Sequence, residues 1–311
     1  MKPQPKVTII VCTFNRAEIL PYCLDSLVDQ TALQDQYEVI VVNNNSSDTT
    51  QDIVDRYTSG YRNIRMILEQ RQGLSHARNK GWKEANADWV AYIDDDAKAP
   101  PGYVERLLHI TKTYPFDCFG GVYIPWYKYQ KPRWFKDEYA SNITVQDHTK
   151  ALASGYVSGG NFAVKKALLE KFNGFQSDLG MRPGKIAYGE ETLLQVKIRD
   201  AGYTIGFDPL LVVEHLVSKE KLSPWWQIRS AYARSRDYNM CLPVSFSYRR
   251  LLHTCNSILH DLPHHVRKST PHLFTDDYCW ENWVIDVFRP IASHLGNIAC
   301  MLISRTHKNK S

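Results

Sequence analysis

Two short acidic runs are the residues of this sequence that most clearly indicate chemistry. Asp94, Asp95 and Asp96 directly follow an apolar run, and three adjacent carboxylates repel one another unless a cation or hydrogen-bond donors compensate. Side chains alternate along an extended chain, so Asp94 and Asp96 should point together. Because Mg²⁺ takes oxygen ligands, often one or two carboxylates plus substrate phosphates, the spacing predicts a cation that bridges to a phosphate. A solvated acidic turn before Pro100 and Pro101 is the alternative.

The second acidic run, Glu190 and Glu191 after Gly189, opens a predicted helix over residues 190–201. Carboxylates at a helix N-terminus are favoured by the helix dipole, so plain helix stabilisation is one interpretation. The other is a general base, which needs a carboxylate within roughly 2.6–3.2 Å of the atom whose proton it removes. The sequence leaves both interpretations open.

Two further side chains could complete such a site. His215 follows Glu214 at the end of a short apolar run, and as a neutral imidazole it would complete the coordination of a cation at Asp96. Its alternative role is a histidine at the edge of the core. Arg78 lies early in a predicted helix, where it would pair with a phosphate in a bidentate way or simply be exposed.

Four short apolar runs would position these groups. Residues 7–12, 37–42, 64–68 and 89–93 are rich in β-branched or aromatic side chains, which is typical of strands buried on both faces. Helix-like segments at about 17–29, 48–58 and 74–86 separate them, and this alternation predicts a parallel sheet with right-handed crossovers. Ligands of such sheets bind beyond the carboxyl ends of the strands. Those ends carry four polar clusters, at 13–16, 43–48, 69–71 and 94–96.

The rest of the chain shows weaker patterns. Residues 101–150 are rich in aromatic side chains without a clear period, which predicts a long irregular segment. A strand ending at 164, a helix at about 165–172 and short strands at 204–207 and 211–214 follow, and from residue 220 the composition becomes helical. An apolar stripe there fits a packed core or a homodimer seam, or a contact with a membrane surface. Its members are Val284, Val287, Phe288, Ile291, Leu295, Ile298 and Leu302.

Composition excludes several classes of protein. The 311 residues carry 38 Lys and Arg against 33 Asp and Glu, with 43 % hydrophobic residues, as in ordinary globular proteins. The basic residues are scattered, which gives no indication of nucleic-acid binding. The seven cysteines are widely spaced and form no C-x-x-C pair, which predicts reduced thiols in a cytoplasmic protein. No signal sequence or membrane-spanning helix is expected, and the phosphate-loop, zinc-protease and α/β-hydrolase motifs are absent.

In their order along the chain, these motifs resemble those of family 2 glycosyltransferases, which have the GT-A fold. The resemblance covers about residues 5–216 and rests on Thr13-Phe14-Asn15-Arg16, the turn at 43–48, Gly73 to Gly81, the Asp triplet, Gly159-Gly160-Asn161, Gly189-Glu190-Glu191 and Glu214-His215. It implies a Rossmann-like α/β fold, with a mainly parallel sheet flanked by helices. Its GT-A domain would cover 1–218, as a nucleotide-binding half (1–100) and an acceptor-binding half (101–218), followed by a helical C-terminal extension (219–311).

The resemblance also implies a reaction, the inverting transfer of a sugar from a nucleotide-diphosphate donor with Mg²⁺ or Mn²⁺ on the diphosphate. Carried over by position, the nucleotide would lie near Thr13, Phe14, Asn15, Arg16, Asn43, Asn45, Arg78, Asp94 and Asp95, and the metal at Asp96 and His215. Gly159, Gly160, Asn161 and Trp126 would line the donor sugar or acceptor, and Glu191 would be the catalytic base, with Glu190 as the second candidate. Asn43 and Glu191 stand where the family usually has Asp, which leaves the nucleotide and the base position open.

Two other functions remain as alternatives. A sugar nucleotidyltransferase would need a glycine-rich basic loop after the first strand, where this chain supplies only Arg16. A non-catalytic carbohydrate-binding module would not need the two acidic runs. The resemblance favours a UDP-linked donor and a glycan or lipid-linked acceptor in bacterial surface polysaccharide synthesis. It implies a cytoplasmic protein, whose C-terminal helices would contact the inner face of the membrane if the apolar stripe is interfacial.

Overall fold

The computed structural model describes residues 4–142, 147–181, 184, 186–242 and 246–308. They form two units, each with its own internal packing. The first, called the sheet unit, comprises Met1–Trp126, Ala140–Pro183 and Glu190–Leu216. The second, called the helical unit, comprises Tyr127–Tyr139, Gly184–Gly189 and Val217–Ser311.

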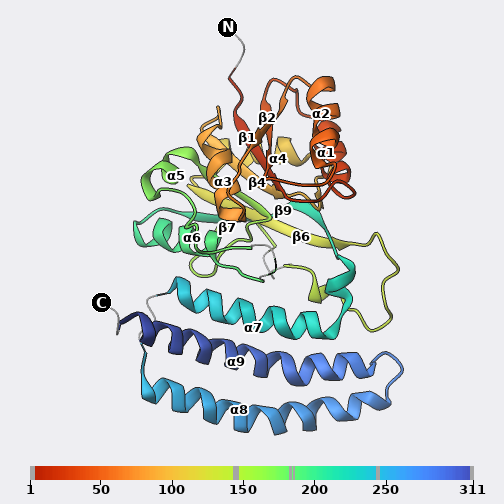
Figure 1. The fold of residues 1–311 in the computed structure, drawn as a ribbon, viewed down its shortest axis with the longest axis vertical. Coiled ribbons are helices and arrows are strands. Elements are labelled where there is room, and N and C mark those ends of the chain that lie inside the picture. Colours follow the sequence, from red (N-terminus) through yellow and green to blue (C-terminus); the bar gives the residue numbers. More distant parts are fainter. Residues whose placement is uncertain (1–3, 143–146, 182–183, 185, 243–245, 309–311) are drawn as a thin grey trace. The chain divides into compact units, whose positions relative to one another are not determined.

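The sheet unit begins with the four predicted parallel strands. They are β1 (Val7–Thr13), β2 (Tyr37–Asn43), β3 (Ile64–Leu68) and β4 (Trp89–Asp94), and they lie in the order β3-β2-β1-β4. Every residue of β2 is buried, as expected for a β-branched run covered on both faces. The prediction of these strands and of their parallel pairing is confirmed (Figure 1).

Five later strands extend this sheet beyond β4. β8 (Asn161–Lys165) pairs antiparallel with β4, and β6 (Cys118–Trp126) and β9 (Ile205–Leu216) follow it. The short β5 (Ala97–Lys98) and β7 (Lys150–Ala151) both pair antiparallel with β9. The β5–β9 pairing matters for the site, because it joins the chain just after the Asp triplet to the chain around His215.

Helices cover both faces of the sheet. One apolar core joins the strands to α1 (Leu20–Val28), α2 (Thr50–Gly60) and α4 (Tyr103–Thr113). The other joins them to α3 (Leu74–Lys83), α5 (Lys166–Phe172) and α6 (Glu190–Asp200). The predicted helices at about 165–172 and 190–201 are therefore confirmed, with α6 beginning at Glu190.

Two expectations about the middle of the chain were wrong. Residues 101–150 are not one irregular segment, because they include α4 and β6. The two short strands expected at 204–207 and 211–214 are one strand, β9, which continues through Pro209. Its pairing with β6 shifts register between Gly121 and Val122, and such a shift lets a strand accommodate an irregular residue without ending.

The helical unit consists mainly of α7 (Pro224–Cys241), α8 (Tyr248–Ser269) and α9 (Trp280–Lys308). Within this unit α9 packs against both α7 and α8 (Figure 1). The aromatic segment around η1 (Asp137–Tyr139) belongs to it as well, since Asn282 Nδ2 donates a hydrogen bond to the carbonyl of Trp134 at 2.7 Å. Among the described residues, no helix is both long and apolar enough to cross a membrane.

Candidate functional site

The loops after β1 and β2 are held together by hydrogen bonds. Asn15 donates its backbone N–H to Ser46 Oγ at 3.0 Å, and its side-chain oxygen accepts the N–H of Ser47 at 2.8 Å. Asn15 and Asn45 both have positive φ, of 52° and 62°, a conformation that asparagine tolerates better than most residues. The residues expected near the nucleotide at these two strand ends therefore lie beside each other.

A residue that the sequence did not single out connects the loop after β2 to the loop between β3 and α3. Asn44 donates its side-chain amide to the carbonyls of Glu69 (3.0 Å) and Arg71 (2.8 Å), and its oxygen accepts the N–H of Gly73 (2.8 Å). Its only signal in the sequence is a polar residue directly after a fully buried strand. The loop after β2 is thereby fixed to the start of α3, which carries Arg78.

Asp94, Asp96 and His215 form one cluster at the end of β4. Each offers a ligand atom, and these atoms all lie within 4.8 Å of one another. His215 Nε2 lies 3.4 Å from Asp94 Oδ2 and 3.3 Å from Asp96 Oδ1. Two carboxylates and one imidazole at this spacing suit a divalent cation. The expected shared direction of Asp94 and Asp96 is thus observed, and His215 reaches them through the β5–β9 pairing.

Arg78 is buried at the centre of the site. Its Nη1 donates to Glu190 Oε1 at 2.7 Å and its Nη2 donates to the carbonyl of Gly159 at 3.2 Å. The same Nη2 lies 3.9 Å from Asp94 Oδ1. Burial alone would lower the pKa of Arg78, but the surrounding carboxylates raise it above its ordinary value. Arg78 therefore connects the start of α6 to the cation cluster.

The two glutamates of the second acidic run differ in exposure. Glu190 is only 4 % exposed, whereas Glu191 is half-buried. Burial and the neighbouring Glu191 raise the pKa of Glu190 to about 8, against the lowering effect of Arg78. A similar cause acts at Asp95, whose pKa is raised to about 7 by burial and by the adjacent Asp96. The site thus concentrates acidic groups, with the buried guanidinium of Arg78 beside Glu190 and Asp94 and the guanidinium of Arg16 acting on Asp95.

The predicted residues of the sugar and acceptor region are divided in the structure. Gly159 and Gly160 border the site, because a Cβ on them would lie 2.8 Å from Arg78 Nη2 and 2.4 Å from Asp94 Oδ2. Asn161 is fully buried, and its side-chain amide donates to the carbonyls of β6 and β9. Its side chain is therefore occupied in holding the sheet together.

Trp126 adjoins the cation cluster through the backbone. Its indole Nε1 donates to the carbonyl of Asp96 at 3.2 Å, and its ring lies 3.8 Å from Lys98 Nζ and 5.3 Å from the Tyr22 ring. Tyr22, Lys98 and Glu214 line a hollow of about 680 Å³. This hollow was not expected from the sequence, because its walls come from α1, β5 and β9.

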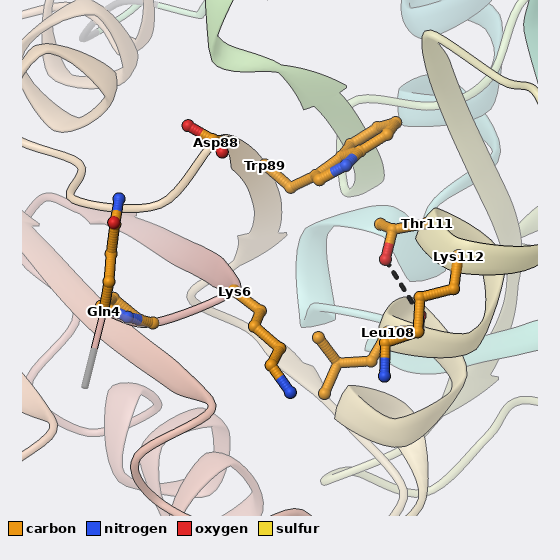
Figure 2. Close-up of a pocket in the computed structure, with 8 residues that line it drawn as sticks. Gln4, Lys6, Asp88, Trp89, Leu108, Thr111 and Lys112 are labelled. Atoms are coloured by element: carbon orange, nitrogen blue, oxygen red, sulfur yellow. Dashed lines mark hydrogen bonds between the residues drawn. The ribbon is translucent and has the colours of Figure 1, made fainter.

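A second hollow lies away from these groups. Its volume is about 350 Å³. The residues that line it lie around the start of β1, around the start of β4 and on α4, and they include Lys6, Trp89 and Leu108 (Figure 2). Thr111 Oγ1 donates to the carbonyl of Leu108 there at 2.9 Å. None of the residues that line it is a predicted site residue, and it contains no cluster of carboxylates.

Comparison with known proteins identifies similar sequences and folds. The model of the family described as glycosyl transferase family 2 matches residues 8–172. A curated relative, the probable glycosyltransferase YdaM of Bacillus subtilis, is 26 % identical over 264 residues, which is 76 % of this chain and 57 % of that protein. The chain thus spans little more than half of that relative's length.

Two solved structures resemble the chain over nearly its whole length. The mannosyltransferase PcManGT from Pyrobaculum calidifontis, in complex with GDP-Man and Mn²⁺, has a TM-score of 0.66 and 20 % identity, covering 95 % of this chain and 87 % of that one. Residues 1–349 of S. aureus TarS in complex with UDP give a TM-score of 0.57 at 17 % identity, covering 98 % and 92 %.

Proposed function

We infer the reaction from one premise: the chain belongs to glycosyl transferase family 2, as its motifs predicted. The likeness to solved glycosyltransferases confirms the predicted GT-A type of fold. On this basis we propose inverting transfer of a sugar from a nucleotide-diphosphate donor to a hydroxyl group. The observation that carries the proposal is the single network that joins Asp94, Asp96 and His215 through Arg78 to Glu190.

The donor would bind across the carboxyl ends of the parallel strands. The nucleoside would lie at the loops containing Thr13, Asn15 and Asn45, which hydrogen bonds hold together. Its diphosphate would extend toward Asp94 and Asp96. A bound Mg²⁺ or Mn²⁺ would neutralise negative charge on the leaving diphosphate. Mn²⁺ accompanies GDP-Man in one related structure and UDP is bound in another, and we propose a UDP-linked donor.

Glu191 would act as the general base of this reaction. It lies in the first turn of α6 and is half-buried, whereas the adjacent Glu190 is buried. Glu191 would take the proton while the acceptor oxygen forms a bond to the anomeric carbon and the bond from that carbon to the diphosphate oxygen breaks. Attack on the side opposite to the leaving group inverts the anomeric configuration.

A screen of donors tests the reaction directly. The purified chain is incubated with UDP- and GDP-sugars, Mn²⁺ and hydroxyl acceptors, and release of the nucleoside diphosphate is measured. Glu191→Gln should lower turnover by about 10²–10⁴-fold, the range typical of a positioned base. Glu84→Gln, at an exposed glutamate on the surface just after α3, is the matched control. The absence of donor turnover and of nucleotide binding by the wild type would contradict the proposal.

The acceptor side of the proposal is a glycan or lipid-linked acceptor of bacterial surface polysaccharide synthesis, reached at the cytoplasmic face of a membrane. The support comes from α8 and α9. Asp261 Oδ2 lies 2.9 Å from His294 Nε2, and Trp283 Nε1 donates to Thr270 Oγ1 at 3.2 Å. These contacts make the helices antiparallel and fix their register.

At this register, exposed apolar side chains lie level with one another along the two helices. The pairs, which we call the apolar ladder, are Leu252 with Leu302, Leu259 with Leu295, and Val266 with Phe288. Successive pairs are seven residues apart, so on each helix they share one face. Arg249 and Arg267 are exposed on α8, which carries four Lys and Arg against one Asp. Such a helix suits an anionic lipid surface.

Vesicle sedimentation tests the membrane contact. Wild-type protein should bind vesicles that contain anionic lipid, and the double variant L259D/L295D should lose this binding. Leu210→Asp, at an equally exposed leucine of the sheet unit, should retain it. If the wild type is a stable dimer without lipid and the double variant is a monomer that still binds vesicles, the apolar ladder is a homodimer seam and the membrane contact is wrong.

A further inference from the structure

Glu190 is built into the protein in a way that does not suit a base. One of its carboxylate oxygens accepts from Arg78 at 2.7 Å, and the side chain is only 5 % exposed. The other oxygen, Oε2, is buried without a hydrogen-bond partner. Gly180 closes over it, because a Cβ at that glycine would lie 2.9 Å from Oε2. An acceptor hydroxyl could not approach either oxygen without opening this packing.

Arg78, in contrast, has contacts on three sides of the site. Its guanidinium reaches Glu190 on α6, the carbonyl of Gly159 before β8, and the neighbourhood of Asp94 at the end of β4. The rings of Tyr92 and Phe175 lie 5.7 Å and 5.4 Å from its central carbon. Removal of Glu190 would leave this buried guanidinium without its closest hydrogen-bond acceptor, which is costly in an apolar surrounding.

We propose that Glu190 is a positioning residue, which holds Arg78 against Gly159 and Asp94 and thereby fixes the distance between the cation cluster and Glu191. This inference rests on the proposed function and assigns the two adjacent glutamates different roles. Glu191 removes the proton. Glu190 does not contact the acceptor and acts through Arg78.

A pH profile of the reaction separates the two roles. A general base must lose its proton to work, so turnover falls on the acidic side of the profile. Glu190→Gln should keep this acidic limb, since the amide oxygen can still accept from Arg78, with turnover lowered up to about 10²-fold by misplacement of the site. Glu191→Gln should lose the limb together with most turnover. Glu190→Ala should be clearly worse than Glu190→Gln, because alanine cannot hold Arg78.

A double-mutant cycle provides a readout that does not depend on protonation. Binding of Mn²⁺ with nucleoside diphosphate is measured by calorimetry for Arg78→Met, Glu190→Ala and the double variant. If the two residues act as one unit, the double variant should bind about as weakly as the weaker single variant. The exposed pair Lys80 and Glu84, on and just after the same helix, supplies the control cycle with no effect on binding.

Either of two results would overturn the inference: loss of the acidic limb in Glu190→Gln, or additive losses of affinity in the cycle. Circular dichroism of each variant shows whether it folds, and the glutamine variants decide the question if Glu190→Ala does not. Failure of the proposed function itself is distinguishable, because then the wild type would neither bind nucleotide nor release it from a donor.

Discussion

Two consecutive glycines leave room for the charged groups of the site. Gly160 lies against Asp94, so closely that a Cβ would be 2.4 Å from the carboxylate oxygen Oδ2. Neither Gly159 nor Gly160 has a positive φ. The requirement for glycine at these positions is therefore one of space and not of backbone conformation.

Gly160→Ala should weaken the binding of Mn²⁺ and nucleoside diphosphate by about tenfold or more. A loss of about 1.4 kcal/mol of binding free energy is enough to lower the affinity tenfold. The added methyl group would push Asp94 out of the cluster with Asp96 and His215. Calorimetric titration measures the affinity. Gly60→Ala is the control, because a Cβ there meets nothing within 4 Å. Unchanged affinity in Gly160→Ala would mean that Asp94 does not hold the cation.

Single residues differ in how far the sequence predicts them. The alternation of side chains was enough to pair Asp94 with Asp96, because it is a local property of an extended chain. The burial of Arg78 could not be predicted, since its partner Glu190 is 112 residues away. The role of Asn161 could not be predicted either. It has the position of a site residue in the motif, but its side-chain amide donates hydrogen bonds to the carbonyls of Val122 and Leu211.

At the level of elements, one buried carboxylate ties α4 to β9. Asp208 is fully buried, and it accepts from Arg106 Nε at 3.1 Å, from Thr149 Oγ1 at 2.5 Å and from the N–H of Leu211 at 2.9 Å. Burial alone would raise the pKa of Asp208, but the hydrogen bonds from Arg106 and Thr149 hold it below its ordinary value of 3.8. The charged form is therefore the stable one in the folded protein.

Asp208→Asn should lower the free energy of unfolding by about 3 kcal/mol at neutral pH, because it breaks a largely buried ion pair. The sign of the pH dependence follows from the lowered pKa. As the pH falls, the Asp208 carboxylate takes up a proton in the unfolded state before it does so in the folded state. The stabilising contribution of Asp208 is therefore present above pH 4 and is lost as the pH falls through its folded pKa.

Urea unfolding of the wild type and Asp208→Asn at several pH values measures this difference. The gap between the two should be largest near neutral pH and should shrink below about pH 4. Glu105→Gln, on the exposed side of α4, controls for a change of charge on the same helix. A gap that stays constant down to pH 3 would show that the charge of Asp208 is not what stabilises the fold.

The elements that sequence patterns missed have misleading local signals. β6 contains Gly120 and Gly121, and β9 contains Pro209, which are all residues that usually weaken or end a strand. Their partners explain them. A Cβ at Gly121 would lie 1.8 Å from the carbonyl oxygen of Leu211, so the glycine lets the two strands approach where their register shifts. The early strands, with neither glycine nor proline, were predictable from composition alone.

On the scale of the whole chain, the division into units cuts across the sequence order. The segments Tyr127–Tyr139 and Gly184–Gly189 belong to the helical unit, although both are flanked by parts of the sheet unit. Tyr188, for example, donates its N–H to Asp237 on α7 at 3.0 Å. Sequence patterns identify elements one at a time, so they could not have revealed this exchange. Glu190 therefore begins α6 directly after a segment that packs on the helices.

Ligand binding should stabilise the chain in a cation-dependent way. A ligand that binds only the folded state adds RT ln(1 + [L]/Kd), which is about 2.7 kcal/mol at a concentration of 100 times Kd. For a unit the size of the sheet unit this corresponds to a rise in Tm of about 5–10 °C. The rise should require both nucleoside diphosphate and Mn²⁺, because the acidic groups around Asp94 repel an uncompensated diphosphate.

Differential scanning fluorimetry with nucleotide, Mn²⁺ or both measures this effect, and Asp96→Ala identifies its origin. The variant removes one of the three clustered ligand groups, so the joint shift should fall toward the shift that nucleotide gives alone. Asp137→Asn, an exposed carboxylate of the helical unit, should keep the full shift. If the nucleotide raises Tm equally with and without Mn²⁺, and equally in Asp96→Ala, other groups hold the diphosphate. Positive side chains would then have to offset the repulsion from the carboxylates. Arg16 and Arg78 would be the cations to replace next.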